Sequence, residues 1–498
     1  MGFLDNIALG FGVAFSPPNL LFCFIGVVVG TLIGVLPGIG PVATISLLLP
    51  ATFGMDPTAS IIMLAGVYYG AMYGGSTTSI LVNIPGEAAS IITCLDGYRM
   101  ARQGRAGPAL GMSAFGSFIG GTASIIGLML LAPVLAKAAL KFGPPEYFAL
   151  MFFGLTMVTY LCRGSVIKGL LMAVAGLAVA TVGQDPISGS TRFTMGSITL
   201  MDGLGLVPVA MGVFGIGEIL TNLESGIKQE VFSARIGSLF PSLQDWVRCK
   251  WPIVRGSLIG FFLGILPGAG TVIPTFIAYA VEKRLSRHPE KFGTGVIEGV
   301  ASPETANNAA TGGSMVTLLS LGIPANIVMA VLLGAFVIHG IQPGPLLISK
   351  HPALFWGTIA SMYVGNMMLL ILNVPMIGVW VRLLKIPYRI LFPLVVLFCF
   401  IGVYSLNNNV NDVFIMVIFG IFGYLMPKFG YEGAPFLMAL VLGPMMEIAF
   451  RQSLLYGDSL IFFRRPISGA FLIFSVLLLI APLWSRFAHR RNVLEQVE

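Results

Sequence analysis

The chain has 498 residues, of which 56% are hydrophobic and only 10% are charged, and its mean hydropathy is +0.91. A water-soluble protein of this size cannot cover its surface with so few charged residues, so the composition excludes soluble enzymes and soluble binding modules. The formal net charge of +7 does not indicate nucleic-acid binding, because the Lys and Arg residues lie in short loops between apolar segments, where they mark membrane topology.

Apolar segments recur from about residue 18 to about residue 484, with short polar breaks between them. Continuous apolar runs span roughly 30 Å of hydrocarbon as helices, whereas a barrel would show alternating segments of about ten residues. The sequence therefore predicts an all-α polytopic membrane protein with about eleven to twelve membrane segments. The first residues, MGFLDNIALGFG, lack the basic region of a secretory signal, so we expect the N-terminus to be retained.

The first unusual segment is TLIGVLPGIGPVATISLLLP, residues 31–50, which places Pro37, Gly38 and Gly40 inside an apolar run. A break in backbone pairing at membrane depth leaves N–H and C=O groups that must face protein, water or a bound solute. Proline removes a donor, and glycine permits a tight turn and close approach of a solute. The arm from Thr44 onward would then offer free N–H groups to a carboxylate. Alternatively, these residues only allow tight helix packing.

Much of this pattern returns later in the chain. GTLIGVLPGIGPV at residue 30 reappears as GFFLGILPGAGTV at residue 260, and GGSTTSILVNIPG from Gly74 is matched by GGSMVTLLSLGIPA from Gly312. A third, weaker pair begins at Pro145 and Pro387. The repetition predicts a first membrane repeat with a basic cytoplasmic linker over residues 1–255, a second repeat over 256–450, and a C-terminal helix with a basic tail over 451–498.

The basic loops predict that the two repeats have opposite orientation. Only about 26 residues separate Arg255 from Glu282, both in basic, cytoplasmic surroundings, with LPGAG between them. Each arm of about 11 residues reaches roughly 16 Å as a helix, about half of the hydrocarbon thickness. The segment should therefore be a re-entrant hairpin. The first copy has acidic or neutral flanks and can enter from the opposite face, which gives the inverted repeat of many secondary transporters, with the site at the midplane.

Hydroxyl, amide and carboxyl groups concentrate in the second pair of motifs. EGVASPETANNAATGG, residues 298–313, is the most polar segment expected at membrane depth, and Glu304 within it could accept a proton or help to hold a cation. The nearby Ser and Thr residues could offer donors to a polar substrate, while unwound carbonyls coordinate a cation. Two alternatives stay open: the hydroxyls only bond their own helix, or the polar segment is an ordinary entrance loop.

Several of these motifs together resemble the large membrane subunit of the tripartite tricarboxylate transporters. They are GVLPGIGPVATISLLLP, GGSTTSILVNIPGE, GILPGAG, EGVASPETANNAATGGSMVTLLSLGIPAN and HGIQPGP. The resemblance implies a permease of the bacterial inner membrane that works with a small membrane subunit and a periplasmic solute-binding protein. It also implies uptake of citrate or another carboxylate, coupled to sodium or protons, and a transport site lined by the LPG turns and the neighbouring Ser, Thr and Asn residues.

The sequence and the resemblance together predict cation-coupled uptake of a tricarboxylate or related carboxylate by alternating access. An anion channel and a non-conducting scaffold subunit are the alternatives. No HExxH, GxSxG or Walker A pattern occurs, so we expect no enzyme, and no metal or cofactor other than the co-transported cation. The predicted substrate and cation site comprises Pro37, Gly38, Gly40, Ser76, Thr77, Thr78, Asn83, Pro267, Gly268, Gly270, Thr271, Glu304, Asn307, Asn308, Thr311, Ser314 and Thr317.

Overall fold

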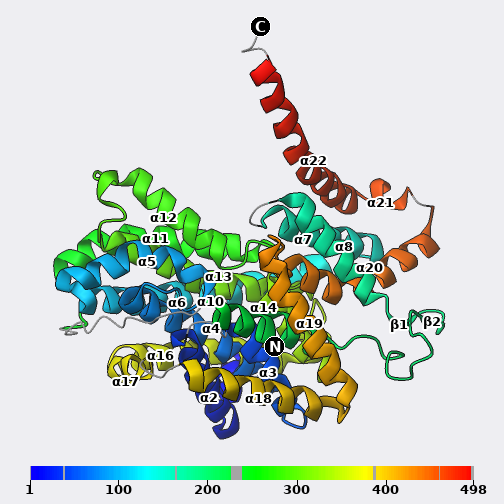
Figure 1. The fold of residues 1–498 in the computed structure, drawn as a ribbon, viewed down its shortest axis with the longest axis horizontal. Helices are drawn as coiled ribbons and strands as arrows, with labels where there is room; N and C mark the ends of the chain where they lie inside the picture. The colour runs from blue at the N-terminus through cyan, green and yellow to red at the C-terminus, as the bar shows by residue number, and fades with distance from the viewer. Residues whose placement is uncertain are drawn as a thin grey trace. The chain divides into compact units, whose positions relative to one another are not determined.

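The computed structural model describes residues 2–36, 40–162, 165–225, 238–384, 388–458 and 460–494. Helices make up most of these residues, and the strands described are one short antiparallel pair, β1 (Gly183–Gln184) and β2 (Thr191–Arg192). The all-α prediction is therefore confirmed (Figure 1). Pro37 and Gly38 of the predicted site lie outside the described residues.

The chain divides into two compact units, and each unit takes segments from both halves of the sequence. Unit 1 contains Met1–Ala139 and Val207–Leu425, and unit 2 contains Leu140–Leu206 and Met426–Glu498. The main helices of unit 1 are α1 (Phe3–Ala14), α2 (Pro17–Val35), α3 (Gly40–Thr52), α4 (Pro57–Val82), α5 (Ile91–Met100), α6 (Ala106–Ala139), α9 (Leu206–Ala210), α10 (Gly217–Ser225), α11 (Leu243–Ile265), α12 (Val272–Leu285), α13 (Glu298–Leu321), α14 (Ile327–Ile338), α15 (Leu347–Lys350), α16 (Pro352–Asn373), α17 (Ile377–Leu383), α18 (Tyr388–Asn407) and α19 (Val410–Lys428). Short helical turns are η1 (Ala88–Ser90), η2 (Ala101–Arg105), η3 (Met211–Ile216) and η4 (Pro289–Lys291).

Six helical segments of the described chain are long and apolar enough to cross a membrane. They are Pro17–Val35, Ala88–Ala139, Leu206–Glu224, Pro352–Asn373, Val410–Lys428 and Gly433–Tyr456, and six shorter apolar helices accompany them. This composition defines a multi-pass membrane protein. The third weak sequence pair is divided between the units, because its first copy is α7 of unit 2 and its second copy includes α18 of unit 1.

The core of unit 1 is formed by α4 and α13, which are buried over nearly their whole length. Glycines four residues apart on α2 and on α11 bring these helices into backbone contact with α4 and α13. A Cβ added at Gly26, Gly30 or Gly34 would lie 2.2–2.4 Å from the carbonyl oxygens of Met63, Val67 and Ala71, and a Cβ at Gly256, Gly260 or Gly264 would lie 2.3–2.6 Å from those of Ser302, Ala306 and Ala310. At these six glycines, close helix packing explains the residue.

The segment around LPGAG turns back on itself, as the sequence predicts. α11 and α12 form an α-hairpin with its corner at residues 266–271. Arg255 Nε lies 2.6 Å from Glu282 Oε1, and a second hydrogen bond of 2.7 Å makes this pair bidentate. The pair joins the middle of α11 to the last turn of α12, so after the corner the chain returns along the second half of α11. The first half of α11, residues 243–254, continues beyond this pair. The two corners share one backbone feature: Gly40 and Gly270 both have a φ of +57°.

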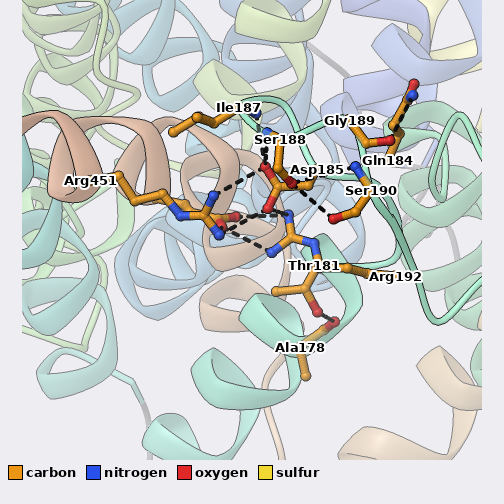
Figure 2. Close-up of polar contacts among 11 residues, drawn as sticks. Ala178, Thr181, Gln184, Asp185, Ile187, Ser188, Gly189, Ser190, Arg192 and Arg451 are labelled. Carbon is orange, nitrogen blue, oxygen red and sulfur yellow. Dashed lines mark hydrogen bonds and ion pairs between the residues drawn. The ribbon is translucent and has the colours of Figure 1, made fainter.

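Unit 2 contains α7 (Pro144–Tyr160), α8 (Val166–Ala180), α20 (Gly433–Tyr456), α21 (Ile461–Arg464) and α22 (Pro466–Leu494). The loop after α8 carries β1 and β2, and two arginines and two carboxylates fasten this β-hairpin to α20 (Figure 2). Arg192 forms bonds of 2.9 and 3.1 Å with Glu447, and Arg451 lies 2.9 Å from Asp185 and 2.7 Å from Glu447. The backbone N–H groups of Ser188 and Ile187, followed by Arg451, lower the pKa of Asp185.

Candidate functional site

Glu304 is the centre of a buried polar cluster between four helices of unit 1. Its side chain comes from α13 and is 1% exposed. The carboxylate accepts hydrogen bonds from Ser76 of α4 and Thr93 of α5, and from Ser113 of α6 at 3.2 Å. These described partners are all hydroxyl groups, so they stabilise the carboxylate without neutralising its charge. A proton or a bound cation is therefore needed to balance the charge in a dry interior.

Two asparagines follow Glu304 one turn later on α13, and their amide groups are only partly satisfied. Asn307 Nδ2 donates to Glu87 Oε1 at 3.1 Å. Asn308 Nδ2 donates to Ser117 Oγ at 2.7 Å and to the carbonyl oxygen of Glu304 at 3.2 Å. Both side chains are 1% exposed, and the Oδ1 atom of each has no hydrogen-bond partner among the described residues. A buried carbonyl oxygen without a donor is costly, and a bound cation or water would offset that cost.

α4 and α13 end in the same way. Asn83 ends α4 with φ 59°, Gly322 ends α13 with φ 71°, and Ile-Pro follows each of them. A polar side chain then caps the next helix in each case. Glu87 accepts from the N–H of Ala89 in η1 at 2.5 Å, and Asn326 accepts from the N–H of Met329 in α14 at 2.9 Å. We call residues 83–87 and 322–326 the tip loops.

Each tip loop contacts the middle of the other core helix. Asn307 of α13 donates to Glu87, and Asn326 donates to the hydroxyl oxygen of Tyr68 on α4 at 3.0 Å. Tyr68 and Asn307 are 239 positions apart, and so are Glu87 and Asn326. At this spacing Tyr68 is equivalent to Asn307, and Glu87 is equivalent to Asn326. The two contacts are therefore the same contact made twice: a residue of one tip loop meets a residue of the other repeat's core helix, first with the loop of the first repeat and then with the loop of the second.

The same spacing corrects the register of the sequence match. The letters GGS align Gly74 with Gly312, but the packing equivalent of Gly74 is Gly313. A Cβ at Gly74 would lie 2.3 Å from Thr31 O, and one at Gly313 would lie 2.3 Å from Phe261 O. Thr31 and Phe261 occupy the same place in the two LPG motifs. The extra residue before the second Ile-Pro explains the shift by one position.

The second LPG corner lies against the second tip loop rather than against Glu304. Gly268 N–H donates to the carbonyl oxygen of Ala325 at 2.8 Å, and a Cβ at Gly270 would lie 3.8 Å from that of Asn326. Pro267 is buried beside them, and Thr271 is half-buried at the start of α12. α3 begins at Gly40. The sequence predicts that the free N–H groups of this arm start at Thr44, so the helix begins four residues earlier than predicted. A Cβ at Gly40 would lie 3.5 Å from Glu218 Oε2.

The remaining predicted residues divide into three groups. Ser76 contacts Glu304, as described above, and Thr78 donates to the carbonyl oxygen of Val35 at the end of α2, 2.6 Å away. Thr77 is buried on α4, whereas Asn83 is exposed at the helix end. Three further hydroxyls donate to a carbonyl oxygen of their own helix: Thr311 at 2.7 Å, Ser314 at 2.8 Å and Thr317 at 3.1 Å.

One expectation about the second motif pair, and one of the alternatives to it, are wrong. α4 and α13 are continuous helices over Pro57–Val82 and Glu298–Leu321, so no unwound carbonyls occur within these ranges. The polar segment beginning at Glu298 is a buried helix and not an entrance loop. Only Glu298 itself is partly exposed, and it forms a bidentate pair with Arg248 at 2.8 and 2.9 Å.

Several residues of the cluster were missed by the sequence analysis. Thr93 is a single hydroxyl in a mixed segment. Ser113 and Ser117 are four residues apart on α6, so they lie on one face of that helix, and this spacing could have indicated a common target. Tyr68 and Asn326 could have been found by extending the motif alignment, because they are the equivalents of Asn307 and Glu87.

The fold and the cluster define a polytopic membrane protein with a buried carboxylate between its central helices, an arrangement suited to moving solutes. The family described as the tripartite tricarboxylate transporter TctA family matches residues 20–438. The chain belongs to this family of membrane transporter components, and it is a multi-pass bacterial membrane protein.

Two curated relatives come from Agrobacterium vitis. An uncharacterized 52.8 kDa protein in the TAR-I ttuC' 3' region is 52% identical over 474 residues, which cover 95% of this chain and 94% of the relative. An uncharacterized protein in the TAR-II ttuC' 3' region is 49% identical over 235 residues, which cover 47% of this chain and 97% of the relative. No solved structure matches the chain.

Proposed function

We propose that this chain is the permease subunit of a tripartite system that takes up a tricarboxylate or related carboxylate together with sodium ions or protons. The observation that carries the proposal is Glu304, a fully buried carboxylate whose described partners are hydroxyl groups. Such a group binds a proton or a cation most strongly when the site is closed from water. This is the property that coupling to a cation gradient requires.

Coupling is also needed on energetic grounds. Moving a trianion into a cell with an inside-negative potential of about 100 mV costs about 7 kcal/mol, at roughly 2.3 kcal/mol per charge. Several co-transported cations would offset this cost, whereas passive entry would not. A cation held near Glu304 would carry part of the compensating charge.

The carboxylate substrate would bind between the two LPG corners and the tip loops. The first turns of α3 and α12 leave backbone N–H groups without helical partners, and helix N-termini attract anions. Gly270 faces Asn326 at the start of α14, and α3 packs on α14. Both hairpins therefore reach the same helix within unit 1, and this supports a shared site.

The exchanged contacts of the tip loops support two inverted repeats. In such repeats, equivalent residues meet across a pseudo-two-fold axis in the membrane plane. The pairs Asn307–Glu87 and Asn326–Tyr68 have the relation that this axis would produce. Alternating access would then follow from movement of the core of unit 1, which carries both hairpins. A small membrane subunit and a periplasmic solute-binding protein would complete the inner-membrane complex, and the binding protein would largely select the substrate.

Reconstitution tests this function directly. The chain would be placed in liposomes with its small subunit, and uptake of labelled citrate and C4-dicarboxylates would be measured with the binding protein present or absent. We expect saturable uptake that needs the binding protein and a sodium or proton gradient. Ionic currents without coupling would instead indicate a channel, and normal uptake by the partners without this chain would indicate a scaffold.

A further inference from the structure

A group of hydrogen bonds joins α5 of the first repeat to α12 of the second repeat and to the loop that follows α12. Asp96 of α5 is 0% exposed. Its Oδ1 accepts from the backbone N–H groups of Gly295 at 2.7 Å, Val296 at 2.9 Å and Gly293 at 3.0 Å. Its Oδ2 accepts from the hydroxyl group of Tyr279 on α12 at 2.8 Å. We call these five residues the α5–α12 latch.

Apolar packing encloses the latch. The ring of Tyr279 meets that of Phe292 edge to face, with the centroids 5.4 Å apart, and Ile92 packs in the same buried cluster. A Cβ added at Gly299, in the first turn of α13, would lie 2.3 Å from Asp96 Oδ2. The carboxylate is therefore shielded from water, and its four donors can stabilise it without a bound cation, since hydrogen bonds to a charged group are the strong ones.

The sequence of the first repeat offers no equivalent of this latch. The LPG motifs are 230 positions apart, and at that spacing Tyr279 corresponds to Leu49. The core helices and tip loops are 239 positions apart, and at that spacing Asp96 corresponds to Ala335. Because the two spacings differ by nine, the connection after the hairpin is longer in the second repeat, where it covers residues 286–297.

The segment that carries the latch has the charge pattern of a cytoplasmic segment. Four exposed basic residues lie in it, at the end of α12 and in the following loop: Lys283, Arg284, Arg287 and Lys291. Two inverted repeats give outward-open and inward-open forms that are nearly mirror images. A contact that only one repeat can make therefore favours one of these forms over the other.

We propose that the α5–α12 latch holds the arm α12 closed on the cytoplasmic side, and that it biases the resting permease toward the form that is closed to the cytoplasm. Asp96 is a positioning residue, because it acts on α12 through Tyr279 and not on the substrate. This inference rests on the proposed function, in which the two arms open in turn. A permease at rest in this form is ready to receive substrate from the periplasmic side.

α5 also connects the latch to the Glu304 cluster. Thr93, three positions before Asp96 on the same face of α5, donates to the carboxylate of Glu304. One helical turn therefore separates the partner of Glu304 from the residue that holds α12. A change of charge at Glu304 that moves Thr93 would also move Asp96 relative to Tyr279.

Cysteine labelling from the cytoplasmic side measures the opening of α12. Thr275→Cys places a reporter one turn before Tyr279, at a position that is 1% exposed. The full chain is labelled with a membrane-impermeant maleimide in inside-out vesicles without substrate, and chains without the reporter give the labelling of the native cysteines. Tyr279→Phe removes the hydroxyl group and keeps the ring beside Phe292. We expect it to label about tenfold faster than the same chain with Tyr279, which corresponds to about 1.4 kcal/mol.

Further variants separate opening of the arm from a loosened fold. Tyr98→Phe on α5 removes a hydroxyl group that has no hydrogen bond among the described residues, and should label as the wild type. Asp96→Asn should label at least as fast as Tyr279→Phe, because the amide has one acceptor oxygen fewer for the four donors. A second reporter, Ser46→Cys, is 0% exposed on α3, the arm of the first repeat, and is labelled in right-side-out vesicles.

Labelling of the α3 reporter should not become faster in Tyr279→Phe, because alternating access opens one arm at a time. Unchanged labelling of the α12 reporter in both latch variants would overturn the proposal. Equal acceleration at both reporters would also overturn it, since it would show that the hydroxyl group only stabilises the fold.

The outcome is separate from that of the uptake experiment, because labelling needs neither substrate nor partner proteins. Faster labelling of the α12 reporter alone, in a chain that transports nothing, would support the latch and contradict the proposed function. Coupled uptake in a chain whose α12 reporter labels equally with and without the latch would support the function and contradict the latch.

Discussion

Arg255, in the middle of α11, and Glu282, in the last turn of α12, are joined by two hydrogen bonds of 2.6 and 2.7 Å. The carboxylate is 4% exposed and the guanidinium group 33% exposed. Because these residues are 27 positions apart and the LPGAG corner lies between them, the pair holds the shape of the whole hairpin. A similar bidentate pair, Arg248 and Glu298, is more exposed, at 43% and 20%.

Glu282→Gln should therefore destabilise the protein more than Glu298→Gln. Hydrogen bonds to charged groups contribute about 1.5–3 kcal/mol when they are shielded from water, whereas exposed ion pairs contribute about 0–1 kcal/mol. Thermal unfolding of the two variants in detergent measures the difference. Equal losses of stability would show that the hairpin does not depend on its closing pair.

The turn of this hairpin could be predicted from the LPGAG corner and the basic residues on both sides of it. The expected arm length of about 11 residues is wrong for the first arm, because α11 runs from Leu243 to Ile265 and reaches roughly 35 Å as a helix. The depth of the corner and the partner of its backbone could not be predicted. The contact between Gly268 and Ala325 joins two segments whose pairing depends on the packing of α11 on α13.

Glu304→Gln should abolish coupling while the fold is retained. Glutamine has nearly the same shape, but it carries no charge to attract a proton or cation. Its single oxygen can accept from only one of Ser76 and Thr93, because these hydroxyls bond to different carboxylate oxygens, and its amide nitrogen would donate to the other. A hydrogen bond or contact to a charged group contributes about 1.5–3 kcal/mol, so we expect gradient-driven uptake to fall by about tenfold or more. Uptake into proteoliposomes measures this loss, and the unfolding temperature checks the fold.

Exchange of labelled for unlabelled substrate in the same liposomes provides a second measurement. Without a gradient, exchange of Glu304→Gln should persist if the carboxylate acts in coupling alone. Wild-type gradient-driven uptake in Glu304→Gln would exclude a role for this residue in coupling.

The Glu304 cluster was predicted only in part, for a clear physical reason. Ser76 and Glu304 stand in recognisable polar motifs, and both were selected from the sequence. Thr93 and Ser113 lie in helices that pack on α13 from other parts of the chain, and hydroxyls in membrane helices most often bond their own backbone. Which of them turns toward a carboxylate is decided by tertiary packing.

Gly260→Ala and Gly12→Ala should change stability in opposite directions. A Cβ at Gly260 would lie 2.3 Å from the carbonyl oxygen of Ala306, so α11 and α13 would have to separate, at a cost of about 1–3 kcal/mol. Gly12 is an exposed residue of α1 with nothing within 4 Å of an added Cβ. Alanine there should stabilise the helix by about 0.5–1 kcal/mol. Thermal unfolding of the two variants tests this, and a stabilised Gly260→Ala would contradict the backbone contact.

The β-hairpin of unit 2 should loosen at acidic pH, and Asp185 should be the cause. Backbone N–H groups of Ser188 and Ile187, and then Arg451, lower the pKa of this carboxyl group in the folded protein. The ionised form is therefore favoured by folding. Its contribution is complete above the usual aspartate pKa of about 3.9 and is lost as the pH falls through the lower, folded value.

Hydrogen exchange of the segment around residues 183–201, measured by mass spectrometry, tests this assignment. At pH 5 and 7, Asp185→Asn should exchange faster than the wild type, because the amide cannot replace the ion pair with Arg451. The difference should shrink as the pH falls below about 3.9, where the wild-type carboxylate begins to lose its advantage. Asp202→Asn, an exposed carboxylate near the end of the same loop, is the matched control and should exchange as the wild type. A difference between Asp185→Asn and wild type that stays constant from pH 3 to 7 would mean that the charge of Asp185 does not hold the β-hairpin.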